Sequence, residues 1–275
     1  MKIVKIASLF IFSILLTGRV LAQGDSKQQL VINLSDPGKP YKLNMHIIEG
    51  SIKVIGYDGK DIEVDSEIDS TKINRNRNNN SNGMRQINGG NSLDITAEEN
   101  NNTVDISSGT SKKALTITLK IPQSGVTLKV STINNGEVTV TNVSGDLEIN
   151  NVNGPITAKG VSGSVVANTV NGNVIVTFKT IDPKAPMAFS TLNGNVDVTL
   201  PADTKANVKL KSDRGEVYTD FEVDVDKSQP KVSKTNEGHM QHIVVEDWVY
   251  GKINGGGPEM MMKNMQGNIY VRKAK

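Results

Sequence analysis

Four methionines close to the C-terminus are the first residues whose type suggests chemistry: Met260, Met261, Met262 and Met265. Thioether sulfurs are ligands for soft metal ions. Counting nine residues back from Gly267, however, places three of the methionines at the apolar positions of a nine-residue unit that recurs through the chain. We therefore interpret Met260, Met262 and Met265 as core residues and expect only Met261 to point outward.

The histidines are the other candidate metal ligands. His239 and His242 are three residues apart, and three acidic residues are near them: Glu237, Glu246 and Asp247. On a strand or a loop this spacing does not bring two side chains together as it would on a helix. His46 is the only other histidine and there is no cysteine. We therefore predict no metal site and no cofactor.

The carboxylates of the central region could in principle catalyse glycoside cleavage, which needs a pair of acidic side chains across the scissile bond. Four acids in this region occur singly, at positions expected to face water: Glu137, Asp146, Glu148 and Asp197. The sequence also lacks a GxSxG nucleophile motif and a phosphate-binding loop with its lysine. We predict no catalytic residue, and the chain is interpreted as a non-enzyme.

Glycines at a constant interval organise the sequence. Five of them follow one another every nine residues: Gly136, Gly145, Gly154, Gly163 and Gly172. Apolar residues occur two and four positions after each glycine, for example Val138 and Val140. Seven positions after the first four glycines come four valines: Val143, Val152, Val161 and Val170. Gly194, Gly215 and Gly267 have the same phase further along the chain.

Each nine-residue unit is predicted to form one strand followed by one turn, at which the chain changes direction. Residues two apart lie on the same face of a strand, so the apolar positions two and four should point to a shared interior. The Asn-Gly and Ser-Gly pairs at the unit boundaries tolerate the backbone conformations of a turn. Glycine, valine and threonine are poor helix formers. All eight glycines of this phase are therefore predicted to be structural.

The repeat predicts an all-β fold, a β-solenoid built as a single-stranded or parallel β-helix of stacked nine-residue strand-turn units. A meander of antiparallel hairpins is the alternative arrangement. Calcium-binding nonapeptide solenoids carry a double glycine and an aspartate in each turn. The present units have one glycine and no such aspartate, which excludes that class.

Several segments resemble a family of exported bacterial β-solenoid domains that comprises adhesin candidates and domains of unknown function. The segments are GSIKVIGYDGKDIEV from Gly50, LTITLKIPQSGVTLKVST from Leu115, the central Asn-Gly repeats, KINGGG and GNIYVRK. The resemblance implies an extracytoplasmic location and a surface or adhesion role, with no defined ligand. The asparagine-rich segment from Thr71 to Asn102 departs from this family.

The N-terminus has the pattern of a secretory signal peptide. Lys2 and Lys5 precede an apolar run that is too short to span a bilayer, and small or apolar residues lead to a cleavage site before Gln23. Cleavage of this signal peptide would remove three cationic residues and change the formal charge from +2 to 2 − 3 = −1. A chain with so little net charge gives no indication of a basic surface that would bind nucleic acid.

We expect the following organisation: a signal peptide at 1–22, an N-terminal cap with the first β units at 23–70, a mobile asparagine-rich insertion at 71–110, a solenoid core at 111–225, and C-terminal β units with a cap at 226–275. Residues 23–48 and the segment around Trp248 are expected to cover the two ends. A short strand is expected near Leu93 to Ile95, inside the insertion.

The leading functional hypothesis is a non-enzymatic, adhesin-like interaction module in the periplasm, at the outer surface or in the medium, with an envelope or extracellular ligand that is a protein or a polysaccharide. A carbohydrate-active β-helix enzyme and an envelope signalling or stress-sensing partner are the alternatives. The mature chain is expected to contain no transmembrane segment.

Overall fold

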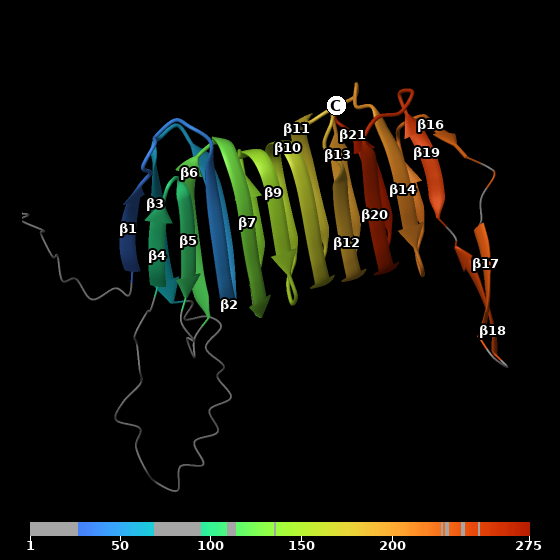
Figure 1. The fold of residues 1–275 in the computed structure, drawn as a ribbon, viewed down its shortest axis with the longest axis horizontal. Coiled ribbons are helices and arrows are strands. Elements are labelled where there is room, and N and C mark those ends of the chain that lie inside the picture. Colours follow the sequence, from blue (N-terminus) through green and yellow to red (C-terminus); the bar gives the residue numbers. More distant parts are fainter. Residues whose placement is uncertain are drawn as a thin grey trace, which may run out of the picture.

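The structure is a computed structural model that describes residues 27–68, 95–108, 114–134, 136–226, 228, 231–237, 240–246 and 248–275. Its elements are β-strands that lie side by side in a long row (Figure 1). The strands are β1 Lys27–Asn33, β2 Tyr41–Tyr57, β3 Asp61–Ile68, β4 Ile95–Asn100, β5 Thr103–Ser108, β6 Leu115–Pro122, β7 Ser124–Asn134, β8 Val138–Thr141, β9 Ser144–Asn151, β10 Ile156–Asn171, β11 Val174–Ile181, β12 Met187–Asn193, β13 Val196–Leu200, β14 Ala206–Ser212, β15 Val217–Thr219, β16 Val223–Val225, β17 Lys231–Glu237, β18 Met240–Glu246, β19 Val249–Ile253, β20 Glu259–Gln266 and β21 Ile269–Lys273. The predicted all-β class is confirmed. None of the described residues belongs to a helix that could cross a membrane.

Strands pair in parallel with the strand two units along the chain, not with their nearest neighbour. Ile156 of β10 lies beside Val138 of β8 and beside Val174 of β11, each 18 residues away. Val165 of the same strand lies beside Leu147 of β9. One coil therefore contains two nine-residue units, and it contributes one strand to each of two opposed faces. The antiparallel meander does not describe this region.

The two faces have a fixed order of strands. Face A contains β1, β3, β6, the second half of β2, β8, the first half of β10, β11, β13, β21 and β15. Face B contains β4, β5, the first half of β2, β7, β9, the second half of β10, β12, β20, β14, β19 and β16. The antiparallel pairs lie at the two ends of these rows.

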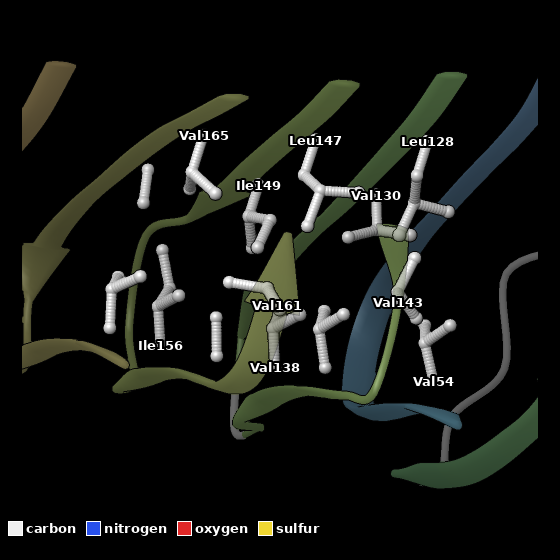
Figure 2. Packing of buried hydrophobic residues seen from close by; sticks show 14 of the residues in the cluster. Val54, Leu128, Val130, Val138, Val143, Leu147, Ile149, Ile156, Val161 and Val165 are labelled. Carbon is white, nitrogen blue, oxygen red and sulfur yellow. The ribbon is translucent and has the colours of Figure 1, made fainter. Parts of the chain in front are cut away.

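The core fills the space between the faces. Figure 2 shows Leu147 and Ile149 from face B pointing toward Val138 and Ile156 from face A. All four side chains are at most 2% exposed. This confirms that positions two and four of the unit point inward. Burying each such side chain contributes about 1.5–3 kcal/mol, and β-branched residues suit a strand packed on one side.

The seventh position of the unit behaves differently at the two corners of a coil. Val143 and Val161 are buried, as expected, with exposed fractions of 1% and 0%. The prediction that all four valines are buried is wrong, because Val170 is 36% exposed and Val152 is half-buried. The physical reason is the two-unit coil: alternate units turn at opposite corners, and these corners orient the residue oppositely.

The same correction applies to the methionines. Met260 and Met262 are buried, with 1% and 0% of their surface exposed, and they line the core as predicted. Met265 takes the outward orientation of Val170 and is 39% exposed, so its predicted burial is wrong. Met261 is half-buried on the outer side of β20.

At the corner where Val170 points outward, the inward residue is polar. We call this the glycine corner, and it comprises residues 47–51, 132–134, 136–137, 151–155, 169–173, 191–195, 212–216 and 264–268. Thr169 is 6% exposed, and its hydroxyl donates a 2.9 Å hydrogen bond to the carbonyl of Gly154. Five more such bonds run along the stack: Thr132 to Gly50, Asn151 to Gly136, Thr191 to Gly172, Asn264 to Gly194 and Ser212 to Gly267. These bonds satisfy carbonyl groups that a buried corner would otherwise leave without a partner.

The predicted structural glycines stack on one another at the two corners. A Cβ atom on Gly154 would lie 1.8 Å from the carbonyl oxygen of Gly136. The equivalent distances to the preceding coil are also too short for a side chain at the other positions: Gly136, Gly172, Gly194, Gly267 and Gly215 at the glycine corner, and Gly145 and Gly163 at the opposite corner. At these positions the backbone of the neighbouring coil occupies the space that a side chain would need.

The spatial order of the coils departs from the chain order at both ends. Strand β2 lies between β5 and β7 on face B and between β6 and β8 on face A. Strand β20 lies between β12 and β14, and β21 lies between β13 and β15. One coil from each end of the chain is thus inserted between two coils formed elsewhere.

The N-terminal end of the stack is closed by β1 and β4, the outermost strands of the two faces. Within the segment 23–48, which was expected to form a cap, β1 is the outermost strand of face A and the first half of β2 lies inside the stack. The expected insertion at 71–110 contains a described part, the hairpin of β4 and β5, which pairs with β2. The strand expected near Leu93 begins at Ile95. Residues 69–94 lie outside the described residues.

Candidate functional site

The outer surface of face B carries aromatic side chains at the C-terminal end of the stack. Trp248, the single tryptophan of the sequence, and Tyr250 of β19 are both half-buried there. The ammonium group of Lys209 lies 4.5 Å from the centre of the Trp248 ring and 5.8 Å from that of Tyr250. The ammonium group of Lys211 lies 5.9 Å from the same Trp248 ring. We call these four residues the aromatic-lysine patch.

The alternation of β14 positions this patch. Ala206, Val208 and Leu210 point into the core, so that Lys209 and Lys211 point outward. The antiparallel register of β19 places Tyr250 directly opposite Lys209. Side chains directly opposite in an antiparallel pair are close enough to interact. The patch is therefore held by strand pairing.

A cavity of about 640 Å³ adjoins the patch between β14, β19 and β16. It is lined by Asn207, Val208, Asp224, Val225, Asp226, Tyr250, Gly251 and Lys252. Gly251 lies between Val208 and Val225 in the strand register and contributes no side chain. Strand β16 is the last strand of face B, which leaves Val225 44% exposed. The hollow thus arises where the stack ends.

The chemistry of this region is that of a binding surface. A lysine over an indole ring is attracted by the ring's negative face, and it retains donors for a ligand. The indole offers a flat apolar face, and the cavity that shares Tyr250 with the patch is lined by two carboxylates, an amide and a further ammonium group. In the part of the chain that the structure describes, no three His, Cys, Asp or Glu side chains form a metal-binding group.

A second aromatic group lies at the same end on face A. Tyr218 and Tyr270 stack with ring centres 5.3 Å apart, and the Arg272 guanidinium lies 4.8 Å from the Tyr270 ring. Arg272 donates two hydrogen bonds, of 2.7 and 3.0 Å, to the carboxylate of Asp197. This bonding raises the pKa of Arg272, and the pair holds the ring stack in place.

The residues first considered for chemistry are dispersed. His46 lies on β2 and its Nδ1 is 2.7 Å from the Ser131 hydroxyl, whereas His242 lies on β18 at the other end of the row (Figure 1). His239 and Asp247 lie outside the described residues, and Glu237 and Glu246 end β17 and β18.

The four central acids face outward with separate partners. Asp146 accepts a 2.6 Å hydrogen bond from Ser164, and Glu148 forms a 3.0 Å ion pair with Lys129. Asp197 is bound to Arg272, and Glu137 is exposed. No two of these carboxylates are brought together as a catalytic pair.

Sequence reasoning missed the aromatic-lysine patch. Trp248 was expected only as part of an end cap. A signal was present, because aromatic residues make up only 4% of the chain, and the tryptophan and three of the five tyrosines follow residue 217. Among these aromatic residues, Trp248, Tyr250 and Tyr270 are half-buried and Tyr218 is 50% exposed, whereas Phe178, Phe189 and Phe221 lie in the core.

Comparison with solved structures found several proteins of low identity. The first is described as a putative cell adhesion protein from Clostridium sporogenes, with 12% identity, a TM-score of 0.37, and coverage of 90% of this chain and 100% of that one. The second is described as a putative adhesin from Bacteroides fragilis, with 12% identity, a TM-score of 0.32, and coverage of 90% and 97%. The third is described as a putative lipid binding protein from Parabacteroides distasonis, with 12% identity, a TM-score of 0.33, and coverage of 92% and 98%.

No curated protein matches the chain. A family match covers the central part of the chain, including β14 and β16 of the cavity, and it ends immediately before Trp248. Residues 132–247 match the family described as Toastrack DUF4097, which confirms the resemblance to a family of domains of unknown function.

Proposed function

We propose that this chain is an exported, non-enzymatic β-solenoid that works as an adhesin-like binding module. The parallel pairing of coils 18 residues apart and their continuous core support the solenoid architecture. The signal-peptide pattern at 1–22 supports export. The observation that carries the binding function is the aromatic-lysine patch, a partly exposed indole beneath two ammonium groups and beside a cavity.

The chemistry of the patch favours a polysaccharide ligand of the cell envelope or the extracellular matrix. The apolar C–H face of a sugar ring packs against an aromatic ring, which supplies a large contact area at little entropic cost. The ammonium groups of Lys209 and Lys252, the amide of Asn207 and the carboxylates of Asp224 and Asp226 supply donors and acceptors for hydroxyl groups.

The test uses the single tryptophan as its own probe. Mature protein is titrated with a panel of neutral and acidic polysaccharides while the Trp248 emission is followed. Binding at the patch should change the emission intensity or wavelength saturably. An independent measurement, co-sedimentation with the insoluble polysaccharides, reports binding without the fluorophore.

Two variants and a matched control make the result specific. Trp248→Ala and Lys209→Met should weaken co-sedimentation at least about tenfold, corresponding to the loss of about 1.4 kcal/mol. Lys159→Met, an exposed lysine on face A in the middle of the stack, should bind as the parent does. Equal binding by the parent and both patch variants would show that the patch is not the binding site. Reproducible release of reducing sugar ends from a polysaccharide would indicate that the protein is an enzyme and not a binding module.

Fractionation of cells that produce a tagged chain tests the export part of the proposal. The mature form should begin at Gln23 and lie outside the cytoplasm. A full-length chain that remains in the cytoplasm would contradict an adhesin-like role.

A further inference from the structure

Three lysines of face B gather beside the Trp248 ring. Lys209 and Lys211 are two residues apart on the outer side of β14, and Lys263 is on the outer side of β20. The parallel register of the two strands places Lys211 directly beside Lys263. The ammonium groups of Lys209 and Lys211 lie 4.5 and 5.9 Å from the centre of the same indole ring. We call Lys209, Lys211 and Lys263 the lysine triad.

The triad brings like charges together, which the sheet itself does not favour. Side chains of like charge that lie opposite each other on neighbouring strands are destabilising. In the part of the chain that the structure describes, Lys211 forms a 3.3 Å ion pair with Asp213, whereas Lys209 and Lys263 form none. The repulsion between these ammonium groups would be relieved by an anion bound among them.

The neighbours of the triad are uncharged on one side and acidic further away. Met261, Ser190 and Tyr250 lie beside the triad in the strand register. The acids Glu259 of β20 and Asp224 of β16 both lie at the level of residue 207, one outward position away from the triad. The aromatic-lysine patch therefore has a positive side, which the triad forms, and a side of mixed charge, which the cavity forms.

We propose that the lysine triad binds the acidic group of a sugar, so that the ligand of the aromatic-lysine patch is an anionic polysaccharide that carries carboxylate or sulfate groups. This inference rests on the proposed function and narrows its ligand class. An ionised carboxylate has only acceptor oxygens, and each ammonium group has three donors and no acceptor. Hydrogen bonds between such groups are shorter and stronger than those between neutral groups. One anionic group placed between Lys211 and Lys263 can accept a bond from each.

The indole ring and the cavity are the reason to assign a sugar and not a free inorganic anion. The ring of Trp248 offers a flat apolar area that suits the C–H face of a sugar ring. The amide of Asn207 and the ammonium group of Lys252 line the adjoining cavity, where they can bond hydroxyl groups. An inorganic anion would contact the lysines alone and would gain nothing from the ring or the cavity.

An anionic membrane suits the triad less well than a polysaccharide does. Segments that recognise anionic lipid headgroups contain about four to eight lysines and arginines. The triad has three, and the adjoining cavity is lined by the carboxylates of Asp224 and Asp226. A negatively charged surface would approach these carboxylates together with the lysines, whereas a single polysaccharide chain can contact the lysines and avoid the acids.

Matched pairs of polymers separate the effect of charge from that of sugar shape. Mature protein is titrated with polygalacturonate and its methyl ester, and with dextran sulfate and dextran, while the emission of Trp248 is followed. An acidic polymer should bind at least about tenfold more tightly than the neutral polymer with the same backbone. Raising NaCl from about 0.05 M to about 0.5 M shortens the screening length about threefold and should weaken binding of the acidic polymer.

Two lysine variants and a matched control locate the charge effect. Lys211→Gln and Lys263→Gln should each weaken binding of the acidic polymer about three- to tenfold, measured by retardation in gels that contain the polymer. Lys159→Gln, an exposed lysine of face A, should bind as the parent does. Lys263→Gln should keep the parent's circular dichroism, and its melting temperature should be unchanged or higher, because a like charge beside Lys211 is removed.

The outcomes separate this inference from the proposed function. Binding to neither acidic polymer, equal affinity within both pairs, or unchanged affinity in both lysine variants would overturn the inference. If Trp248→Ala still loses binding to a neutral polymer, the proposed function stands and only the ligand class is wrong. If Trp248→Ala also binds every polymer as the parent does, both proposals fail. Binding to phosphatidylglycerol vesicles that Lys263→Gln abolishes, without binding to either acidic polymer, would assign the triad to a membrane.

Discussion

Glycine and a buried polar group act together at each turn of the glycine corner. The glycine lets the next coil approach to backbone contact, and a hydroxyl or amide from that coil then satisfies the glycine carbonyl. Neither residue type alone would suffice. A side chain on the glycine would separate the coils, and an apolar inward residue would leave a buried carbonyl without its hydrogen bond, which costs about 1–3 kcal/mol.

Gly154→Ala tests the close approach. The new Cβ would lie 1.8 Å from the Gly136 oxygen, and the φ of Gly154 lies outside the left-handed region, so the cost is steric. We expect a loss of about 3 kcal/mol or more in the free energy of unfolding, measured by denaturant titration. Gly38→Ala is the control, because its φ is +86° and no atom is near the new methyl group. It should cost about 1–2 kcal/mol, through backbone strain alone. Equal losses in the two variants would contradict the stacking argument.

Glu99 gives a pH-dependent contact at the N-terminal end. Its carboxylate accepts hydrogen bonds from the hydroxyl and the main-chain N–H of Ser35, at 2.8 and 3.1 Å, and these bonds lower the pKa of Glu99. A group with a lowered folded pKa stabilises the fold above its unfolded pKa and loses that contribution as the pH falls through the folded pKa. The protection factors of the amides around Ser35, corrected for the intrinsic exchange rate at each pH, should therefore fall on acidification below about pH 4. Glu99→Gln should remove most of this acid dependence, and an unchanged profile in that variant would contradict the assignment.

The position of a residue within its strand decides whether its side chain lies on a face of the stack or at a corner. Strand β20 shows both, since its central residues alternate between core and surface while its end turns at the glycine corner. Met262 and Met265 have the same chemistry and lie three residues apart, yet one is fully buried and the other 39% exposed. Because the two side chains are identical, the difference in their exposure comes from their positions in the coil.

Met262→Ala should lower the free energy of unfolding by about 2–5 kcal/mol, because it leaves a cavity between two coils. Met265→Ala should change it by less than about 0.5 kcal/mol, as surface substitutions usually do. Chemical denaturation of the two variants with the parent checks both values. A large loss at Met265 would indicate that this side chain is buried, and therefore that the glycine corner is wrongly oriented.

The whole molecule is a stack closed by its own ends. In a simple solenoid each coil contacts only its neighbours in sequence, and unfolding can begin at either end. Here the last coil, β20 and β21, separates coils that are consecutive in the chain. The C-terminal coils therefore cannot form their final pairing until the end of the chain is available.

Deletion of residues 258–275 tests this dependence. Strands β14, β15 and β19 lose the coil that joins them to β12 and β13, and their amides should exchange at near-unprotected rates. Strands β7 to β11 keep their neighbours and should remain protected. Hydrogen exchange measured by mass spectrometry distinguishes the two regions. Protection of residues 206–226 in the truncated chain would show that the last coil is not required.

Local pattern was enough to determine the strands, their inward residues and the glycine phase, because alternation and glycine spacing follow from backbone geometry within a few residues. Leu147, Ile149 and Met262 could be placed in the core for that reason. The 18-residue coil, the outward Val170 and Met265, and the insertion of β2 and β20 were decided by pairing between residues far apart in sequence. A nine-residue period fits a one-unit and a two-unit coil equally well, and only the tertiary contacts separate them. The aromatic-lysine patch likewise depends on the antiparallel pairing of β19 with β14, which joins residues about 40 apart in sequence and is not encoded in any local spacing.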